Sequence, residues 1–228
     1  MIIAIDGPAG AGKGAVAKMI DEKLDYTRID TGAMYRCITL KMIRNNLRLT
    51  DVDKIKELLE NTNIELKKIN NELYVYMDGE DVTKEIRSPK VNEFVSPVSS
   101  VKEIRVKMVD LQRNMKNTTK NIVMEGRDIT TVVFPDADVK IYLTATLEER
   151  AKRRTKELND SGIDTTYEEI YKSIKKRDEN DINKEMGALK IAEGATIIDN
   201  TNLSIQETFD RICEICMTYQ EKNCQKNS

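Results

Sequence analysis

A glycine-rich stretch near the start of the chain, residues 7–14 (GPAGAGKG), constrains the fold more than any other feature of the sequence. It follows a short apolar run, residues 1–6, of the kind that forms a buried strand. The segment after it, residues 15–24, carries apolar side chains at helical spacing. A strand, a glycine loop and a helix in this order predict a phosphate-binding loop, with a plain strand-to-helix turn as the alternative.

The chemistry of such a loop follows from its residue types. Glycines let successive backbone N–H groups turn inward with no Cβ in the way, which makes a concave site for an anion. The following helix directs the positive end of its dipole to the same place, and Lys13 can reach the outer phosphates of a nucleoside triphosphate. We therefore expect the phosphates of ATP to bind Gly7, Pro8, Ala9, Gly10, Ala11, Gly12, Lys13 and Gly14.

Composition limits the remaining possibilities. The chain has 228 residues, of which 39% are hydrophobic and 33% charged, as expected for a globular protein. Its net charge of −2 gives no reason to expect a nucleic-acid partner. No apolar run approaches the ~20 residues that span a bilayer, and no basic leader precedes the first strand. We expect a cytoplasmic protein without a membrane partner.

Cysteine and histidine usage excludes other chemistry. The chain has four cysteines and no histidine, and Cys213 and Cys216 form a C-x-x-C pair. Without histidine or a second cysteine pair, buried thiols within the last helix are a better interpretation than a zinc or redox site. The missing histidine also removes the usual general base, which phosphoryl transfer does not need because it depends on positioning and charge.

The order of elements predicts an α/β fold. Strand and helix patterns alternate over the first residues, which favours a parallel sheet that binds its ligand at the carboxyl ends of the strands. Alternating residues around Asn70-Asn71 predict an antiparallel hairpin within residues 63–83. A strand ending in Glu125 places a carboxylate where it can orient Mg²⁺, with a solvated side chain as the alternative. We expect the closing helix to end near Tyr219, with a frayed tail from Glu221.

Several longer motifs carry a resemblance to a known family. They are IDGPAGAGKG, DTGAMYR from Asp30, GEDVTKEIR from Gly79, EGRD with TVVFPDADVKIYL, EERAKRR from Glu148, and KKRD from Lys175. In this order, over about residues 2–210, they resemble the bacterial cytidylate kinases, which phosphorylate CMP and dCMP with ATP. The segments GEDVTKEIR and TVVFPDA are more discriminating than the phosphate loop, which unrelated nucleotide enzymes share.

The resemblance implies a three-layer phosphate-loop kinase fold with a parallel five-stranded core sheet, a small antiparallel insertion and a helical lid. The core would comprise residues 1–35, 101–150 and 189–228, the acceptor-binding region residues 36–100, and the lid residues 151–188. It also implies ATP and Mg²⁺ as cofactors, and a monomer that binds small molecules only.

The resemblance further implies roles for individual residues. Binding of the acceptor nucleotide is implied for Thr31, Tyr35, Arg36, Ser96, Arg105, Arg127, Asp128, Arg177 and Asp181. Direct catalytic roles are implied for Arg127, Asp128, Arg153 and Arg177 together with Lys13, and Arg154 would bind ATP from the lid. Asp128 can accept a hydrogen bond from the cytosine amino group, with Arg105 and Ser96 as further partners, or it can only anchor Arg127 and its loop.

Three positions depart from the family pattern. Ala15 stands where a hydroxyl is expected, Thr130 where glycine is common, and Lys184 where arginine is usual. These departures keep two alternatives open. One is a kinase of the same fold with another small acceptor, and the other is a non-catalytic module that binds nucleotide or RNA through the basic helices near Glu148 and Tyr167.

Overall fold

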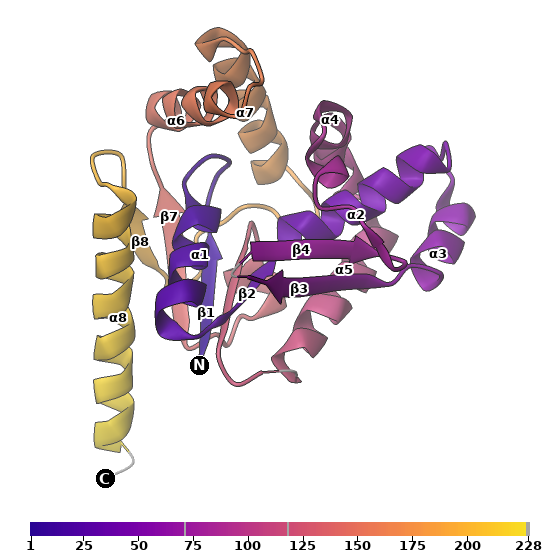
Figure 1. The fold of residues 1–228 in the computed structure, drawn as a ribbon. Coiled ribbons are helices and arrows are strands. Elements are labelled where there is room, and N and C mark those ends of the chain that lie inside the picture. Colours follow the sequence, from indigo (N-terminus) through magenta and orange to yellow (C-terminus); the bar gives the residue numbers. More distant parts are fainter. Residues whose placement is uncertain (71, 118, 227–228) are drawn as a thin grey trace. The chain divides into compact units, whose positions relative to one another are not determined.

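The computed structural model describes residues 1–70, 72–117 and 119–226 (Figure 1). The chain divides into two compact units. Unit 1 consists of Met1–Arg28 and Lys120–Ser228, and unit 2 consists of Ile29–Thr119. The expected division into core, acceptor region and lid is finer than this and stays a prediction.

A five-stranded sheet organises unit 1, in the order β2-β6-β1-β7-β8. Its strands are β1 (Ile2–Asp6), β2 (Thr27–Asp30), β6 (Ile122–Gly126), β7 (Val139–Thr144) and β8 (Thr196–Asp199). β1 pairs in parallel with β6 and β7, and β7 pairs in parallel with β8. The strand that leads into the glycine loop is therefore central, and the predicted parallel α/β fold is confirmed.

Among the described residues of unit 1, four α-helices accompany the sheet. They are α1 (Lys13–Leu24), α6 (Leu147–Asp160), α7 (Tyr167–Ile182) and α8 (Ile205–Lys226). A single π-helical turn, η3 (Ile129–Val133), follows β6. Apolar residues of α1, of the sheet and of α8 form one core, which includes Ile5, Ile20, Ile141 and Ile212. This core fixes the end of β1 and the start of α1, between which the glycine loop lies.

Helix α8 is longer than expected. It continues to Lys226, so the prediction of a frayed tail from Glu221 is wrong up to that residue. The polar residues at this end have adequate helix propensity, and they extend a helix that is already anchored by its buried face. Burial in that face raises the pKa of Cys216 to about 12, as expected for a packing thiol. Within the described part of the chain, no helix has the length and apolar character needed to cross a membrane.

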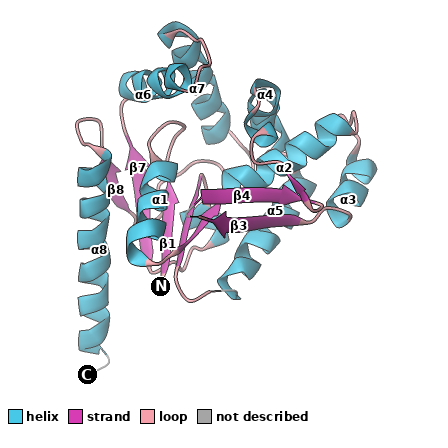
Figure 2. Cartoon of the chain, in the orientation of Figure 1, coloured by secondary structure: helices cyan, strands magenta, loops and turns pink. Residues whose placement is uncertain are grey.

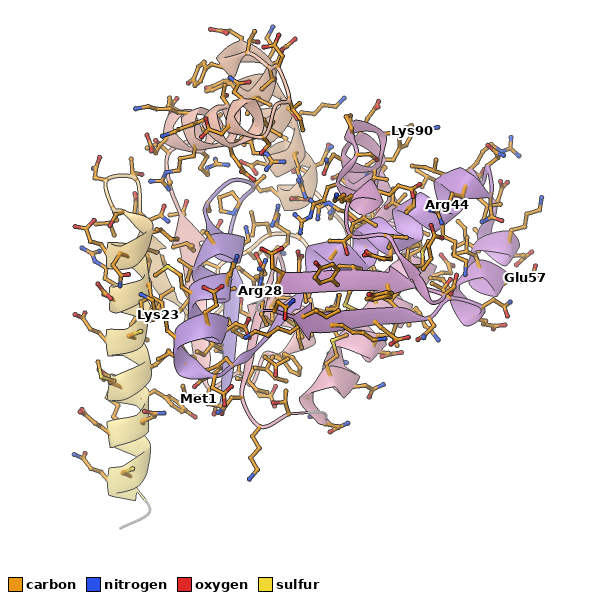
Figure 3. All side chains as sticks on the ribbon, in the orientation of Figure 1. Met1, Lys23, Arg28, Arg44, Glu57 and Lys90 are labelled. Carbon is orange, nitrogen blue, oxygen red and sulfur yellow. The ribbon has the colours of Figure 1, made fainter. Side chains whose placement is uncertain are left out.

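Unit 2 combines helices with a small antiparallel sheet (Figure 2). Its elements are α2 (Thr31–Arg44), α3 (Val52–Glu60), β3 (Ile64–Ile69), β4 (Glu72–Met77), β5 (Glu80–Asp81), η1 (Glu85–Arg87), α4 (Pro89–Val98), α5 (Lys102–Asn114) and η2 (Met115–Asn117). β3 and β4 form the expected hairpin, although Asn71 in its turn lies outside the described residues. Arg44, labelled in Figure 3, binds the carboxylate of Glu80 at 2.7 Å and so ties α2 to β5.

The start of the glycine loop leads to a prediction about stability. A Cβ at Gly7 would lie 1.9 Å from the backbone oxygen of Leu143, whereas a Cβ at Gly162 would meet nothing within 4 Å. Gly7→Ala should therefore lower the free energy of unfolding by about 3 kcal/mol or more, because backbone must move. Gly162→Ala keeps only the cost of a left-handed backbone, ~1–2 kcal/mol. Urea unfolding followed by circular dichroism measures both, and equal losses would contradict the close packing at Gly7.

Candidate active site

The glycine loop, residues 7–12, joins the central strand β1 to helix α1. Gly10 and Gly12 have φ angles of 77° and 87°, which glycine adopts without the steric penalty of a side chain. Gly12 is the N-cap of α1, and no side chain caps the helix there. The first N–H groups of a helix have no acceptor within the helix, so this end of α1 can bind an anion.

Lys13 lies with its ammonium group beneath the loop. Its Nζ atom donates hydrogen bonds of 2.7 Å to the carbonyl oxygens of both Gly7 and Pro8. The residue is only 6% exposed. Burial, reinforced by the positive charge of Arg127, holds the pKa of Lys13 well below its usual value. A phosphate arriving beside Lys13 would favour the charged ammonium, because a nearby opposite charge stabilises it.

Asp6, at the end of β1, holds the turn that follows β6. Its carboxylate accepts hydrogen bonds from the backbone N–H groups of Ile129 and Thr130, at 2.9 and 2.7 Å, and from the Thr130 hydroxyl at 2.5 Å. Burial raises the pKa of Asp6, and the bonds from Thr130 and Ile129 oppose that rise. Thr130, the residue that departs from the family's glycine, therefore supplies a hydroxyl to a fully buried acid.

A charged cluster in unit 1 contains several predicted site residues. Arg127 Nε and Lys184 Nζ bind the two carboxylate oxygens of Asp181, at 2.7 and 2.8 Å. Burial alone would raise the pKa of Asp181, but the charges of Arg127 and Lys184 outweigh it and lower that pKa. Arg177 lies close enough to act electrostatically on both Asp181 and Lys13. Lys184 therefore supplies a positive charge where the family has arginine.

Arg153 and Arg154, which are predicted to act from a lid, bind protein groups in this structure. Arg153 donates to the side-chain and backbone oxygens of Asn200, at 3.1 and 2.7 Å, and to Glu149 at 2.9 Å. Arg154 pairs with Glu157 on its own helix, at 2.6 Å. Their contacts with ATP stay predictions.

Glu125 lies at the end of β6, beside the phosphate loop. Its Oε1 atom accepts a 2.8 Å hydrogen bond from Arg28, which is labelled in Figure 3. A Cβ on Gly14 would lie 3.1 Å from Glu125 Oε1 and 3.2 Å from Arg28 Nη2. The carboxylate therefore borders the position after the loop lysine, where other phosphate loops carry a hydroxyl for Mg²⁺.

In unit 2, three residues predicted to bind the acceptor nucleotide, Tyr35, Ser96 and Arg105, lie in one cluster. The Arg105 guanidinium lies 5.8 Å from the centre of the Tyr35 ring, and Arg105 Nη1 donates to the Ser99 carbonyl at 3.4 Å. Ser99 in turn donates from its hydroxyl to the Ser96 carbonyl, at 2.8 Å. The Ser96 hydroxyl oxygen is buried and has no hydrogen-bond partner among the described residues. Such a group costs ~1–3 kcal/mol, a cost that a polar ligand can offset.

The remaining predicted residues are placed on both units. Thr31 is buried in the first turn of α2, which Asp30 caps by accepting from the backbone of Ala33 at 2.9 Å. Arg36 donates to the side chain of Asn92 on α4, at 3.3 Å. Asp128 is buried in unit 1, and its carbonyl accepts from the backbone of Val132 at 2.8 Å.

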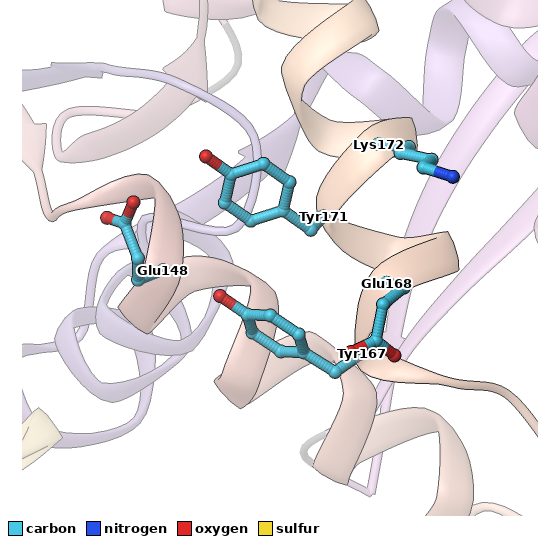
Figure 4. Close-up of a pocket in the computed structure, with 5 residues that line it drawn as sticks. All are labelled: Glu148, Tyr167, Glu168, Tyr171 and Lys172. Atoms are coloured by element: carbon cyan, nitrogen blue, oxygen red, sulfur yellow. The ribbon is translucent and has the colours of Figure 1, made fainter.

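A pocket of about 310 Å³ lies between α6 and α7 (Figure 4). It is lined by Glu148, Tyr167, Glu168, Tyr171 and Lys172. The two tyrosine rings lie 5.9 Å apart between their centres. With two carboxylates against one lysine, this pocket does not suit a polyphosphate.

Comparison with known proteins decides the family. The family model described as cytidylate kinase matches residues 3–218. The cytidylate kinase of Caldicellulosiruptor saccharolyticus is 48% identical over 213 residues, which cover 93% of this chain and 94% of that protein. The chain belongs to the cytidylate kinase family. The cytidylate kinase of Caldanaerobacter subterraneus subsp. tengcongensis is 49% identical over 212 residues, which cover 93% of this chain and 92% of that protein.

Membership makes this chain a nucleotide-binding kinase, that is, a phosphotransferase with ATP as the phosphate donor. A solved structure of an uncharacterized protein from Eubacterium ventriosum agrees in fold, with a TM-score of 0.52 at 14% identity. The match covers 94% of this chain and 96% of that one.

Sequence reasoning missed four residues that hold the phosphate loop or its surroundings: Asp6, Arg150, Asp178 and Asn200. Asp6 and Asn200 could have been found, because each lies at the carboxyl end of a strand of a parallel sheet, where ligands bind. Arg150 and Asp178 lie 28 residues apart and meet only through the packing of two helices.

The bond between Thr130 and Asp6 gives a prediction about stability. Thr130→Val should lower the free energy of unfolding by about 1–3 kcal/mol, because a buried carboxylate loses a donor. The pKa of Asp6 is already raised, and losing this donor would raise it further. The deficit should therefore grow as the pH rises above the usual pKa of aspartate, since only the ionised form needs the bond.

Thr131→Val is the matched control. The Thr131 hydroxyl is buried, and among residues 1–70, 72–117 and 119–226 it has no partner, so its loss should be neutral or stabilising. Urea unfolding at pH 5 and pH 8 measures both variants. If Thr130→Val behaved like Thr131→Val at both values, Thr130 would not stabilise the Asp6 carboxylate.

Proposed function

We propose that this protein catalyses transfer of the γ-phosphoryl group of ATP to CMP and dCMP, with Mg²⁺, giving ADP and the cytidine diphosphates. One observation carries the proposal: the Lys13 ammonium is buried under a phosphate loop, in a chain of the cytidylate kinase family. A cytoplasmic location and a monomeric state stay predictions.

On the donor side, the phosphate loop and α1 bind the phosphates of ATP. In this structure, Lys13 donates to the carbonyls of Gly7 and Pro8. We infer that its ammonium moves to the outer phosphates when ATP binds. The exchange is favourable because a phosphate oxygen carries more charge than a carbonyl, and charge-assisted hydrogen bonds are the stronger ones.

The residues beside the loop fit a magnesium ion bound largely through the substrate. Among the described residues no three acidic or sulfur side chains gather into a metal site. Mg²⁺ is usually bound through one or two carboxylates, waters and substrate phosphates, and Glu125 supplies one carboxylate beside the loop. Its partner Arg28 already offsets its charge, which favours a contact through water. The ion would neutralise charge on the phosphates.

On the acceptor side, Tyr35, Ser96 and Arg105 are suited to bind a base. The cytosine ring offers acceptors at N3 and O2, which the Arg105 guanidinium and the Ser96 hydroxyl can serve as donors. Uracil presents an N–H group at position 3 instead, which a guanidinium cannot accept. Asp128 is proposed to accept from the amino group of cytosine, with the alternative that it only anchors Arg127 and its loop.

The transfer itself needs no base of the histidine type. An oxygen of the acceptor phosphate forms a bond to the γ-phosphorus while the bond from that phosphorus to the ADP oxygen breaks, without a covalent enzyme intermediate. Lys13, Arg127 and Arg177 carry the charges that stabilise the migrating group. Arg127 and Arg177 lie close enough to Lys13 to lower its pKa, to which burial contributes most.

The second candidate, a non-catalytic nucleotide- or RNA-binding module, has less support. It rested on the basic helices, yet Arg150 and Arg153 bind backbone groups of the fold, including the carbonyl oxygens of Ala9 and Asn200. These two side chains therefore do not form a solvated basic face for RNA.

ADP release measured with a panel of nucleoside monophosphates tests the proposed function. CMP and dCMP should give kcat/KM at least about 10²-fold above UMP, AMP and GMP, because unpaired buried polar groups penalise the wrong base. Lys13→Ala should lower kcat with CMP by about 10²–10⁴ through loss of one charge partner of the transition state.

Lys18→Ala is the matched control, because this lysine lies on the same helix with an exposed side chain that pairs with Glu22. It should retain activity within about threefold. Preference for another monophosphate would identify a kinase of the same fold with a different acceptor. Turnover with none of them would leave the binding module as the better account.

A further inference from the structure

The loop residue Ala9 has both of its backbone polar groups bound by a single ion pair. Its N–H donates to Asp178 Oδ1 at 3.0 Å, and its carbonyl accepts from Arg150 Nη1 at 2.7 Å. The same Nη1 atom binds Asp178 Oδ2 at 2.6 Å. Arg150 lies on α6 and Asp178 on α7, so two helices hold one residue of the phosphate loop.

This ion pair is more buried than the pair that Arg154 and Glu157 form on α6. Arg150 and Asp178 side chains are 8% and 13% exposed, whereas those of Arg154 and Glu157 are 37% and 63% exposed. Arg150 Nε also donates to the Ala145 carbonyl at 2.9 Å, which fixes its guanidinium plane. Removing two charges from water is costly, so the burial of this ion pair is weak evidence that it stabilises the fold. A role in holding Ala9 is the alternative that its hydrogen bonds support.

Apolar packing brings the same helices onto the loop. Ala9 belongs to a cluster with Ala151 of α6 and Ile174 of α7. A Cβ at Gly10 would lie 3.2 Å from the Cβ of Arg150, so the loop backbone approaches α6 directly. Movement of either helix would therefore move Ala9.

Asn200 makes a second connection of the same kind. Its Nδ2 atom donates to the Ala11 carbonyl at 3.0 Å, and its own oxygens accept from Arg153 of α6. Together with Lys13, these groups bind the carbonyl oxygens of four loop residues, which are Gly7, Pro8, Ala9 and Ala11. When Lys13 moves to the phosphates of ATP, the Ala9 and Ala11 carbonyls stay held by Arg150 and Asn200 and do not turn toward a phosphate, which carbonyl oxygens repel.

We propose that Arg150 and Asp178 are positioning residues, which clamp Ala9 so that the phosphate loop is preformed for ATP and linked to α6 and α7. The inference rests on the proposed function for its reaction, but it concerns ATP alone. The clamp acts on the donor phosphates through the loop and has no part in recognition of the acceptor base. Loss of the clamp should therefore raise the KM for ATP more than the KM for CMP.

Equilibrium binding of a fluorescent ATP analogue, beside steady-state kinetics, tests the clamp. Arg150→Met removes the donor to Ala9 while keeping an unbranched side chain, and it should weaken ATP binding and raise the KM for ATP by about tenfold or more. The KM for CMP should stay within about threefold. Lys152→Met, at an exposed position of the same helix, is the control and should leave both unchanged.

Variants of Asp178 keep the test decisive if Arg150→Met does not fold. Asp178→Asn retains an oxygen for the Ala9 N–H but loses the charge pair, whereas Asp178→Ala loses both. ATP affinity should fall in that order, and Glu179→Gln on the exposed side of α7 should match the wild type. Circular dichroism and thermal unfolding show which variants are folded.

Two results would overturn the clamp. The first is that folded Arg150→Met and Asp178→Ala bind ATP as tightly as their control variants do. The second is that the KM values for ATP and CMP rise by the same factor, which would indicate a general structural role. Failure of the proposed function is distinguishable. A wild-type protein that binds ATP and ignores CMP would disprove the proposed function, and the effect of the variants on ATP affinity would still decide the clamp.

Discussion

The phosphate loop depends on what binds its carbonyl oxygens. A loop that binds phosphate must direct N–H groups toward the ligand and keep its carbonyls away. Here Lys13 binds those of Gly7 and Pro8, while the Ala9 and Ala11 carbonyls bind Arg150 and Asn200. The glycines permit this backbone, but the groups around the loop select it. This arrangement buries the ammonium group of Lys13, and the burial lowers its pKa.

Two buried carboxylates, those of Asp6 and Asp181, hold other groups of unit 1 in place. Asp6 ends the strand before the loop and holds the turn that contains Thr130. Asp181 holds Arg127 and Lys184 and so fixes two cations in one place. The departures from the family pattern at positions 130 and 184 therefore have physical explanations, since each residue makes a hydrogen bond to a buried carboxylate. Nothing in the structure explains the loss of a hydroxyl at Ala15.

The sequence predicted local features well and pairings between distant segments poorly. The phosphate loop and the hairpin follow from short patterns, because each depends on neighbours along the chain. The parallel sheet was expected from the alternation of strand and helix patterns, although β1 pairs with strands that lie far from it in the sequence. The role of Arg150 was not predicted, since nothing near it in sequence shows that it meets Asp178 and Ala9 in the fold. The predicted end of α8 was wrong for a related reason. Polar residues extend this helix beyond the part whose buried face anchors it to the core. The predicted acceptor residues came from family resemblance and not from any pattern in the chain.

The central claim is that Lys13 passes from the loop carbonyls to the phosphates of ATP. Nitrogen-15 NMR of the lysine side chains, titrated with pH, measures it directly, with Lys13→Met to assign the resonance. In the free protein the pKa of Lys13 should lie below its usual value, because the group is buried and Arg127 is close. With a non-hydrolysable ATP analogue bound, that pKa should rise, because the polyanion favours the charged ammonium. An unchanged pKa at saturating analogue would contradict the account.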